Sequence, residues 1–170
     1  MAKSNLIIFG SSRGDGNTRK IVQFLEQQIE AEFIDLNDYA FSEFDYEYQN
    51  ANDDFIGLAE RMVQYSNIIF ATPVYWYSMS ALMKKYFDRM SDIVIFRKEI
   101  GRAMAKKNLF VLACSSDQME YDCLFMPFEK TAEYLDMNFG GRVHTWIEEE
   151  EITKEVKLKV VDFAKKIEAK

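Results

Sequence analysis

Short, continuous apolar runs alternate along the chain with stretches in which apolar residues recur every three or four positions. Continuous runs of this length are typical of strands that are buried on both faces, as in parallel sheets. Each run ends at a glycine, a proline or a group of polar residues. The pattern predicts strands over residues 6–9, 32–36, 67–71, 109–114 and 143–147.

The stretches between these runs predict amphipathic helices, because their apolar residues fall on one face at helical spacing. The predicted buried positions are Ile21, Val22, Leu25 and Ile29; Ile56, Ala59 and Val63; Leu82, Tyr86 and Met90; and Ile152, Val156, Val160, Ala164 and Ile167. Pro127 suits the first turn of a further helix that runs to about Met137, or a kink within a longer one. Ser80, and either Asp53 or Asp54, are suitable N-caps. Residues 39–52 and 91–106 are predicted to be loops, the second because of Gly101 and its basic neighbours.

A strand followed by a helix, five times over, predicts a parallel sheet with helices on both faces, a three-layer α/β fold. The 170 residues fit one domain, residues 1–170. Ligands of such sheets bind beyond the carboxyl ends of the strands. The loops after Phe9, Ala71 and Cys114 are therefore the candidates for a functional site.

The loop after the first strand has the composition of a phosphate site. It leads into a helix N-terminus, where free N–H groups and the helix dipole favour an anion. Gly14 and Gly16 would let the backbone approach a ligand closely. The loop lacks the lysine of a Walker loop, and Arg19 stands where the dinucleotide fingerprint needs its last glycine. A polar turn that merely caps the helix is the alternative. The candidate residues are Ser11, Ser12, Arg13, Gly16, Asn17 and Thr18.

Three adjacent aromatic residues, 75–77, follow the third strand. In a loop they could form an apolar slot for a planar ring, or else cover the sheet end or a subunit contact. The loop after the fourth strand would add a third wall, in which Cys114 is expected to be a small buried side chain. The candidate residues are Pro73, Val74, Tyr75, Trp76, Tyr77 and Ser78 in one loop and Cys114, Ser115, Ser116 and Asp117 in the other.

Two of these segments together resemble a known family. Ser11-Ser12-Arg13 with Gly16-Asn17-Thr18 is similar to the phosphate loop of NAD(P)H-dependent FMN reductases of flavodoxin-like fold, and residues 72–89 are similar to their isoalloxazine loop and following helix. The resemblance covers nearly all of residues 4–168. It implies the sheet order 2-1-3-4-5 and NAD(P)H as electron donor. It also implies bound FMN, with the candidate residues of the first loop at the phosphate and those of the other two loops at the flavin ring. It also implies a homodimer with the flavin near the interface.

The resemblance predicts an oxidoreductase that passes a hydride from NAD(P)H through FMN to a small acceptor: a quinone, a flavin, a nitro or azo compound, or a metal ion. No side chain is expected to be obligatory for the chemistry itself. A flavodoxin that carries single electrons, and a flavin-free binding protein of the same fold, are the alternatives. Arg13, Lys84 and Arg102 are candidates for contact with the 2′-phosphate of NADPH.

Composition excludes several other classes. A chain with 48% hydrophobic and 15% aromatic residues is not intrinsically disordered. A net charge of −7 argues against nucleic acid as a partner, and no apolar run is long enough to span a membrane. Met1 to Asn5 do not resemble a secretory signal, and with only two cysteines a cytoplasmic location is expected. Residues 44–55 lack the cysteines of an iron–sulfur cluster, and His144, the only histidine, is expected to be a packed or surface residue; no metal site is predicted.

Overall fold

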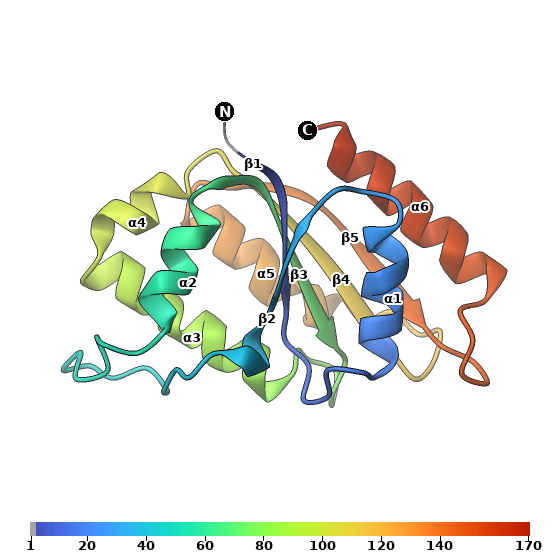
Figure 1. Ribbon diagram of the computed structural model, residues 1–170, viewed down its shortest axis with the longest axis horizontal. Coiled ribbons are helices and arrows are strands. Elements are labelled where there is room, and N and C mark those ends of the chain that lie inside the picture. Colours follow the sequence, from blue (N-terminus) through green and yellow to red (C-terminus); the bar gives the residue numbers. More distant parts are fainter. Residues whose placement is uncertain (1–2) are drawn as a thin grey trace.

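Five parallel strands form one sheet in the order β2-β1-β3-β4-β5, which confirms the predicted topology. The computed structural model describes residues 3–170 (Figure 1). Met1 and Ala2, which begin the segment examined for a secretory signal, lie outside the described residues. The strands are β1 (Lys3–Phe9), β2 (Glu32–Asp35), β3 (Tyr65–Pro73), β4 (Asn108–Ser115) and β5 (Asn138–Trp146).

Helices cover both faces of the sheet and enclose two apolar cores. Figure 1 shows α1 (Asn17–Glu26) and α6 (Lys154–Glu168) on one face. The other face carries α2 (Phe55–Met62), α3 (Ala81–Ile95), α4 (Lys98–Ala103) and α5 (Asp122–Tyr134), while a short 3₁₀ helix, η1 (Leu36–Asp38), follows β2. Pro127 lies in the second turn of α5 rather than in its first. Within residues 3–170 no helix combines the length and the apolar character needed to cross a membrane.

The prediction of a loop over 91–106 is wrong, since this segment completes α3 and forms α4. Its apolar side chains at Ile93, Ile100 and Met104 are buried against the sheet. Gly101, which suggested a loop, marks a close approach of the two helices: a Cβ there would lie 2.5 Å from the carbonyl oxygen of Ile93.

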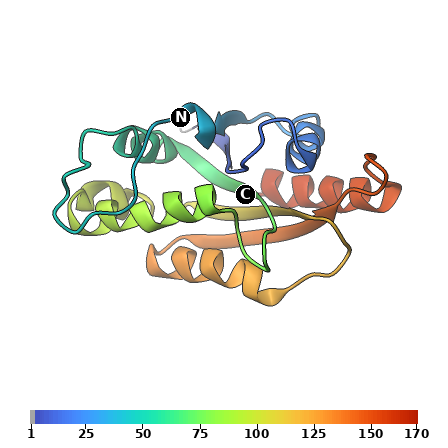
Figure 2. The same ribbon diagram turned by 90° about the horizontal axis from the view of Figure 1, so that it is seen from below.

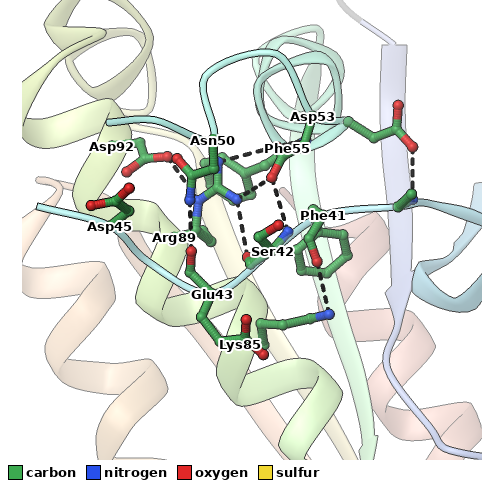
Figure 3. Close-up of polar contacts among 12 residues, drawn as sticks. Phe41, Ser42, Glu43, Asp45, Asn50, Asp53, Phe55, Lys85, Arg89 and Asp92 are labelled. Carbon is green, nitrogen blue, oxygen red and sulfur yellow. Dashed lines mark hydrogen bonds and ion pairs between the residues drawn. The ribbon is translucent and has the colours of Figure 1, made fainter. Parts of the chain in front are cut away.

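The segment 39–54 lacks regular helix or strand, as predicted for residues 39–52, but it is tied to α3 by a buried guanidinium (Figure 3). Arg89 is fully buried and forms ion pairs with Asp92, on its own helix, and with Asp53. It also donates to the carbonyl oxygen of Ser42 at 3.0 Å. Arg89 thus holds both ends of an otherwise irregular acidic segment against the domain core.

A row of asparagines closes the amino ends of the strands. Asn67 donates to the side chain of Asn5 at 2.8 Å, Asn108 donates to Asn67 at 2.7 Å, and Asn138 donates to Asn108 at 3.2 Å. Asn5 donates in turn to Glu168 near the end of α6. These side chains satisfy one another, and the loops of interest all lie at the opposite, carboxyl edge of the sheet (bottom in Figure 1).

Candidate functional site

The loops after β1, β3 and β4 meet at the carboxyl edge, which Figure 2 views from below, and enclose a cleft of about 300 Å³. The cleft is lined by Ser11, Arg13, Gly16, Asn17, Thr18, Pro73, Val74, Tyr75, Cys114, Ser115 and Ser116. All of these residues belong to the set expected from the sequence. The other members of that set, Ser12, Trp76, Tyr77, Ser78 and Asp117, are exposed residues of the same loops that do not line the cleft.

A larger hollow of about 590 Å³ lies at the amino edge. Glu30, Glu32 and Glu168 line it, so an anionic cofactor would meet like charges there. The smaller cleft has the opposite character. Among residues 3–170, one arginine and no carboxylate line it, in a chain whose net charge is −7, and the exposed Asp15 does not line it.

The start of α1 leaves its first backbone N–H groups without a side-chain cap. Its N-cap is Gly16, whereas Ser80 and Thr153 cap α3 and α6 with their own hydroxyl oxygens. Uncapped N–H groups at a helix start are donors for an anion. With the hydroxyls of Ser11 and Thr18 nearby, this donor set fits a phosphate group.

Gly16 itself is not required by the protein's own packing. Its φ of −74° suits any residue, and a Cβ there would lie 3.7 Å from the nearest side chain, an ordinary contact. The absence of a side chain at Gly16 leaves open space at the cleft wall.

Ser80 joins the first two loops, a role that the sequence did not reveal beyond the N-cap. Its hydroxyl donates to the carbonyl oxygen of Gly10 at 2.6 Å and accepts from the N–H of Met83 at 3.0 Å. Gly10 has to be glycine, because a Cβ there would lie 2.9 Å from Cε and 3.2 Å from Cα of Met83. The start of α3 is thereby packed directly against the end of β1.

Asn37 is a second supporting residue that sequence reasoning missed. Its side-chain amide donates to the carbonyl oxygen of Ser11 at 2.7 Å. This contact fixes the β1–α1 loop from the side of β2. Nothing in the local sequence distinguishes this asparagine from one in an ordinary turn.

The three aromatic residues form a two-residue hairpin. Tyr75 and Ser78 exchange backbone hydrogen bonds of 2.9 and 3.1 Å, and Trp76 and Tyr77 both have positive φ, 48° and 64°. Left-handed backbone is disfavoured for residues with a Cβ by about 1–2 kcal/mol each. The turn places the Trp76 side chain in solvent, where 92% of it is exposed.

Burial keeps the Cys114 thiol protonated. Desolvation raises its pKa to about 11, and hydrogen bonds with Thr145 and Thr18 only partly oppose this effect. A thiol in this state is a poor nucleophile at neutral pH. Cys114 therefore contributes a small, uncharged surface to the cleft wall.

The three basic residues that are candidates for contact with the 2′-phosphate of NADPH lie in different parts of the structure. Arg13 lines the cleft. Lys84, in the second turn of α3, forms an exposed ion pair with Asp88 at 2.5 Å. Arg102 lies on α4, near the opposite edge of the sheet, and is remote from the three loops (Figure 1).

Comparison with known proteins agrees with this geometry. Residues 5–147 match the protein family described as NADPH-dependent FMN reductase. A Bacillus subtilis protein, "Putative NAD(P)H-dependent FMN-containing oxidoreductase YwqN", is 29% identical over 147 residues, which are 81% of each chain.

Solved structures show the same fold. The structure of a Trp repressor binding protein from Bacillus subtilis superimposes with a TM-score of 0.74 and 25% identity, covering 96% of this chain and 97% of the other. An FMN-dependent NADH-azoreductase from Bacillus anthracis, solved with FMN, gives a TM-score of 0.69 at 13% identity over 98% and 97% of the two chains. The second likeness is one of fold alone.

Proposed function

Since the chain belongs to the NADPH-dependent FMN reductase family, we propose that the cleft at the carboxyl edge is the place where it holds FMN. The chain is an FMN-dependent NAD(P)H oxidoreductase. The observation that carries the placement is the cleft's charge: one arginine, no carboxylate and an uncapped helix start, in an acidic protein.

The FMN phosphate is assigned to the β1–α1 loop. Backbone N–H groups at the start of α1 would bind it together with the side chains of Ser11, Arg13, Asn17 and Thr18, and Ser12 and Gly16 would contribute. The Asn37 and Ser80 contacts hold this loop in place before a ligand arrives. A preformed loop of this kind lowers the entropic cost of binding.

The flavin ring is assigned to the space between the loops 73–78 and 114–117. Tyr75 and Ser115 line the cleft from its two sides, and the exposed Trp76 and Tyr77 extend beyond it. When bound, FMN accepts a hydride from NAD(P)H and passes two electrons to the acceptor. The chain's own groups bind and align the reactants, and backbone N–H groups at the ring edge stabilise negative charge.

The acceptor is proposed to be a small oxidised molecule: a quinone, a free flavin, a nitro or azo compound, or a metal ion. We further propose a single flavodoxin-like domain that acts as a homodimer in the cytoplasm. The exposed aromatic side chains at 75–77 support a subunit contact beside the ring, and the two unpaired cysteines fit a reducing compartment.

The placement is tested by comparing FMN with riboflavin, which lacks the phosphate. Fluorescence titration of the apoprotein is expected to give much tighter binding of FMN than of riboflavin. Arg13→Ala should weaken FMN binding about tenfold and leave riboflavin binding unchanged, because a charge-assisted phosphate contact is lost. Arg102→Ala, an exposed arginine on α4, is the matched control. Equal losses for both flavins, or an effect of the control, would contradict the placement.

A further inference from the structure

His144, the only histidine in the chain, is buried next to the cleft without lining it. It lies on β5 opposite Ala113 of β4, and 2% of its surface is exposed. Its Nε2 atom is 2.7 Å from the hydroxyl oxygen of Ser115, which lines the cleft. The imidazole therefore touches the back of the third cleft wall.

The hydrogen bonds around Ser115 fix which imidazole nitrogen carries the proton. The Ser115 hydroxyl donates to the carbonyl oxygen of Asp117 at 2.6 Å, and a carbonyl can only accept. The hydroxyl has a single proton, so its contact with His144 must be one in which Nε2–H donates. The chain of donors runs from His144 to Ser115 to the backbone of Asp117.

The other nitrogen, Nδ1, is buried, and within residues 3–170 it has no hydrogen-bond partner. A second proton there would leave a buried N–H without an acceptor, which is costly. Burial lowers the pKa of His144, with Lys159 acting in the same direction and Glu120 and Asp117 opposing it. The side chain is thus a neutral donor with one defined tautomer.

We propose that His144 is a positioning residue for FMN: through Ser115 it fixes the wall formed by residues 114–117 against which the flavin ring binds. The inference rests on the proposed placement of FMN. The wall is otherwise an exposed turn at a strand end, with Ser116 and Asp117 both open to solvent. A neutral imidazole orders this turn without placing a cation behind it.

The first test is a ¹⁵N spectrum of the imidazole, which a single histidine makes unambiguous. In the apoprotein at pH 7 we expect a neutral ring protonated on Nε2, with a shift of the Nε2 resonance on saturation with FMN. A ring protonated on Nδ1, a charged ring, or a spectrum that FMN leaves unchanged would overturn the proposal.

The second test measures FMN dissociation constants of variants. His144→Phe and Ser115→Ala should each weaken FMN binding about three- to tenfold, the value of one hydrogen bond. The double variant should lose no more than either single variant, because the two side chains act through the same contact. His144→Gln, whose amide can still donate, should stay within about twofold of the wild type.

Val143→Ala is the matched control, because this residue precedes His144 on β5 and is buried in the core that the sheet forms with α1 and α6. It should lower thermal stability and leave FMN affinity unchanged. If His144→Phe behaves in the same way, the histidine has only a packing role and the proposal is wrong. Failure of the wild type to bind FMN would instead overturn the proposed site, and this inference with it.

Discussion

At the residue scale, burial holds two titratable groups in their neutral forms, one in the cleft wall and one directly behind it. Cys114 and His144 lie on neighbouring strands, and desolvation is the largest cause of the pKa shift in each. Neither group adds charge to the cleft, where Arg13 is the one cation among the lining residues of the described range 3–170. Both therefore lead to predictions that need no ligand.

Cysteine labelling distinguishes the buried thiol from the exposed one. With a thiol-specific disulfide reagent at pH 8, Cys123 should react quickly and Cys114 only after unfolding, because Cys114 is buried and has its pKa raised to about 11. One thiol should be counted in native protein and two in denaturant. Rapid reaction of both in the native protein would contradict the burial described above.

The stability of the apoprotein should depend on His144 in acid. Its folded pKa lies below the usual value of 6.5, so the unfolded chain binds the proton more readily. The stability contributed by the neutral ring is present above pH 6.5 and is lost as pH falls through the folded pKa. Urea unfolding should therefore show a steeper fall in unfolding free energy below pH 6.5 for the wild type than for His144→Gln. Parallel curves for the two proteins would count against a buried neutral ring.

At the element scale, the hairpin 75–78 keeps two strained residues for reasons that its own packing does not explain. Trp76 is almost fully exposed, so replacing it removes little buried surface. The same turn geometry occurs at Glu149 and Glu150, which have φ of 46° and 66° and do not line the cleft. This second turn offers a comparison for the first.

Trp76→Gly should keep or raise the unfolding free energy, by up to about 1 kcal/mol, because glycine accepts positive φ without strain. It should also weaken FMN binding about threefold through loss of an aromatic contact with the ring. Glu149→Gly is expected to change stability in the same direction and leave FMN binding unchanged. Unfolding by urea and flavin fluorescence measure the two effects, and equal FMN affinity in wild type and Trp76→Gly would refute a role for the indole.

The buried ion pairs of α3 predict a large effect for Arg89→Met. Removing the guanidinium leaves the buried Asp92 and the largely buried Asp53 without their partner, at a cost of about 3 kcal/mol or more. Arg97→Met removes ion pairs of a partly exposed arginine and should lower the unfolding free energy far less. Similar denaturation midpoints for the two variants would contradict the account of Arg89.

Strands and helices can be predicted from the sequence where the spacing of apolar residues follows directly from which side chains are buried. The five strands and the residues of the three loops follow from it. The prediction of a loop over 91–106 is wrong because a glycine is expected both in a loop and where two helices approach closely. The sequence alone does not separate these two cases at Gly101. The contacts of Ser80 with Gly10 and of His144 with Ser115 join residues 70 and 29 positions apart, and they depend on strand register, which the sequence pattern does not specify.

At the scale of the whole molecule, the two edges of the sheet have different roles. The amino edge is closed by mutually bonded asparagines and bordered by glutamates, and the carboxyl edge carries an acid-free cleft beneath three interlinked loops. This asymmetry supports the proposed placement of an anionic cofactor at the carboxyl edge.

The most direct measurement is an anaerobic visible absorption spectrum of the FMN-loaded protein before and after addition of NADPH, repeated with NADH. We expect a protein-bound flavin spectrum that bleaches rapidly with at least one of the two nucleotides. Dithionite, as the control, should bleach it as well. A bound flavin that neither nucleotide reduces would contradict the reductase function. No bound flavin at all would contradict the assignment of FMN to the cleft.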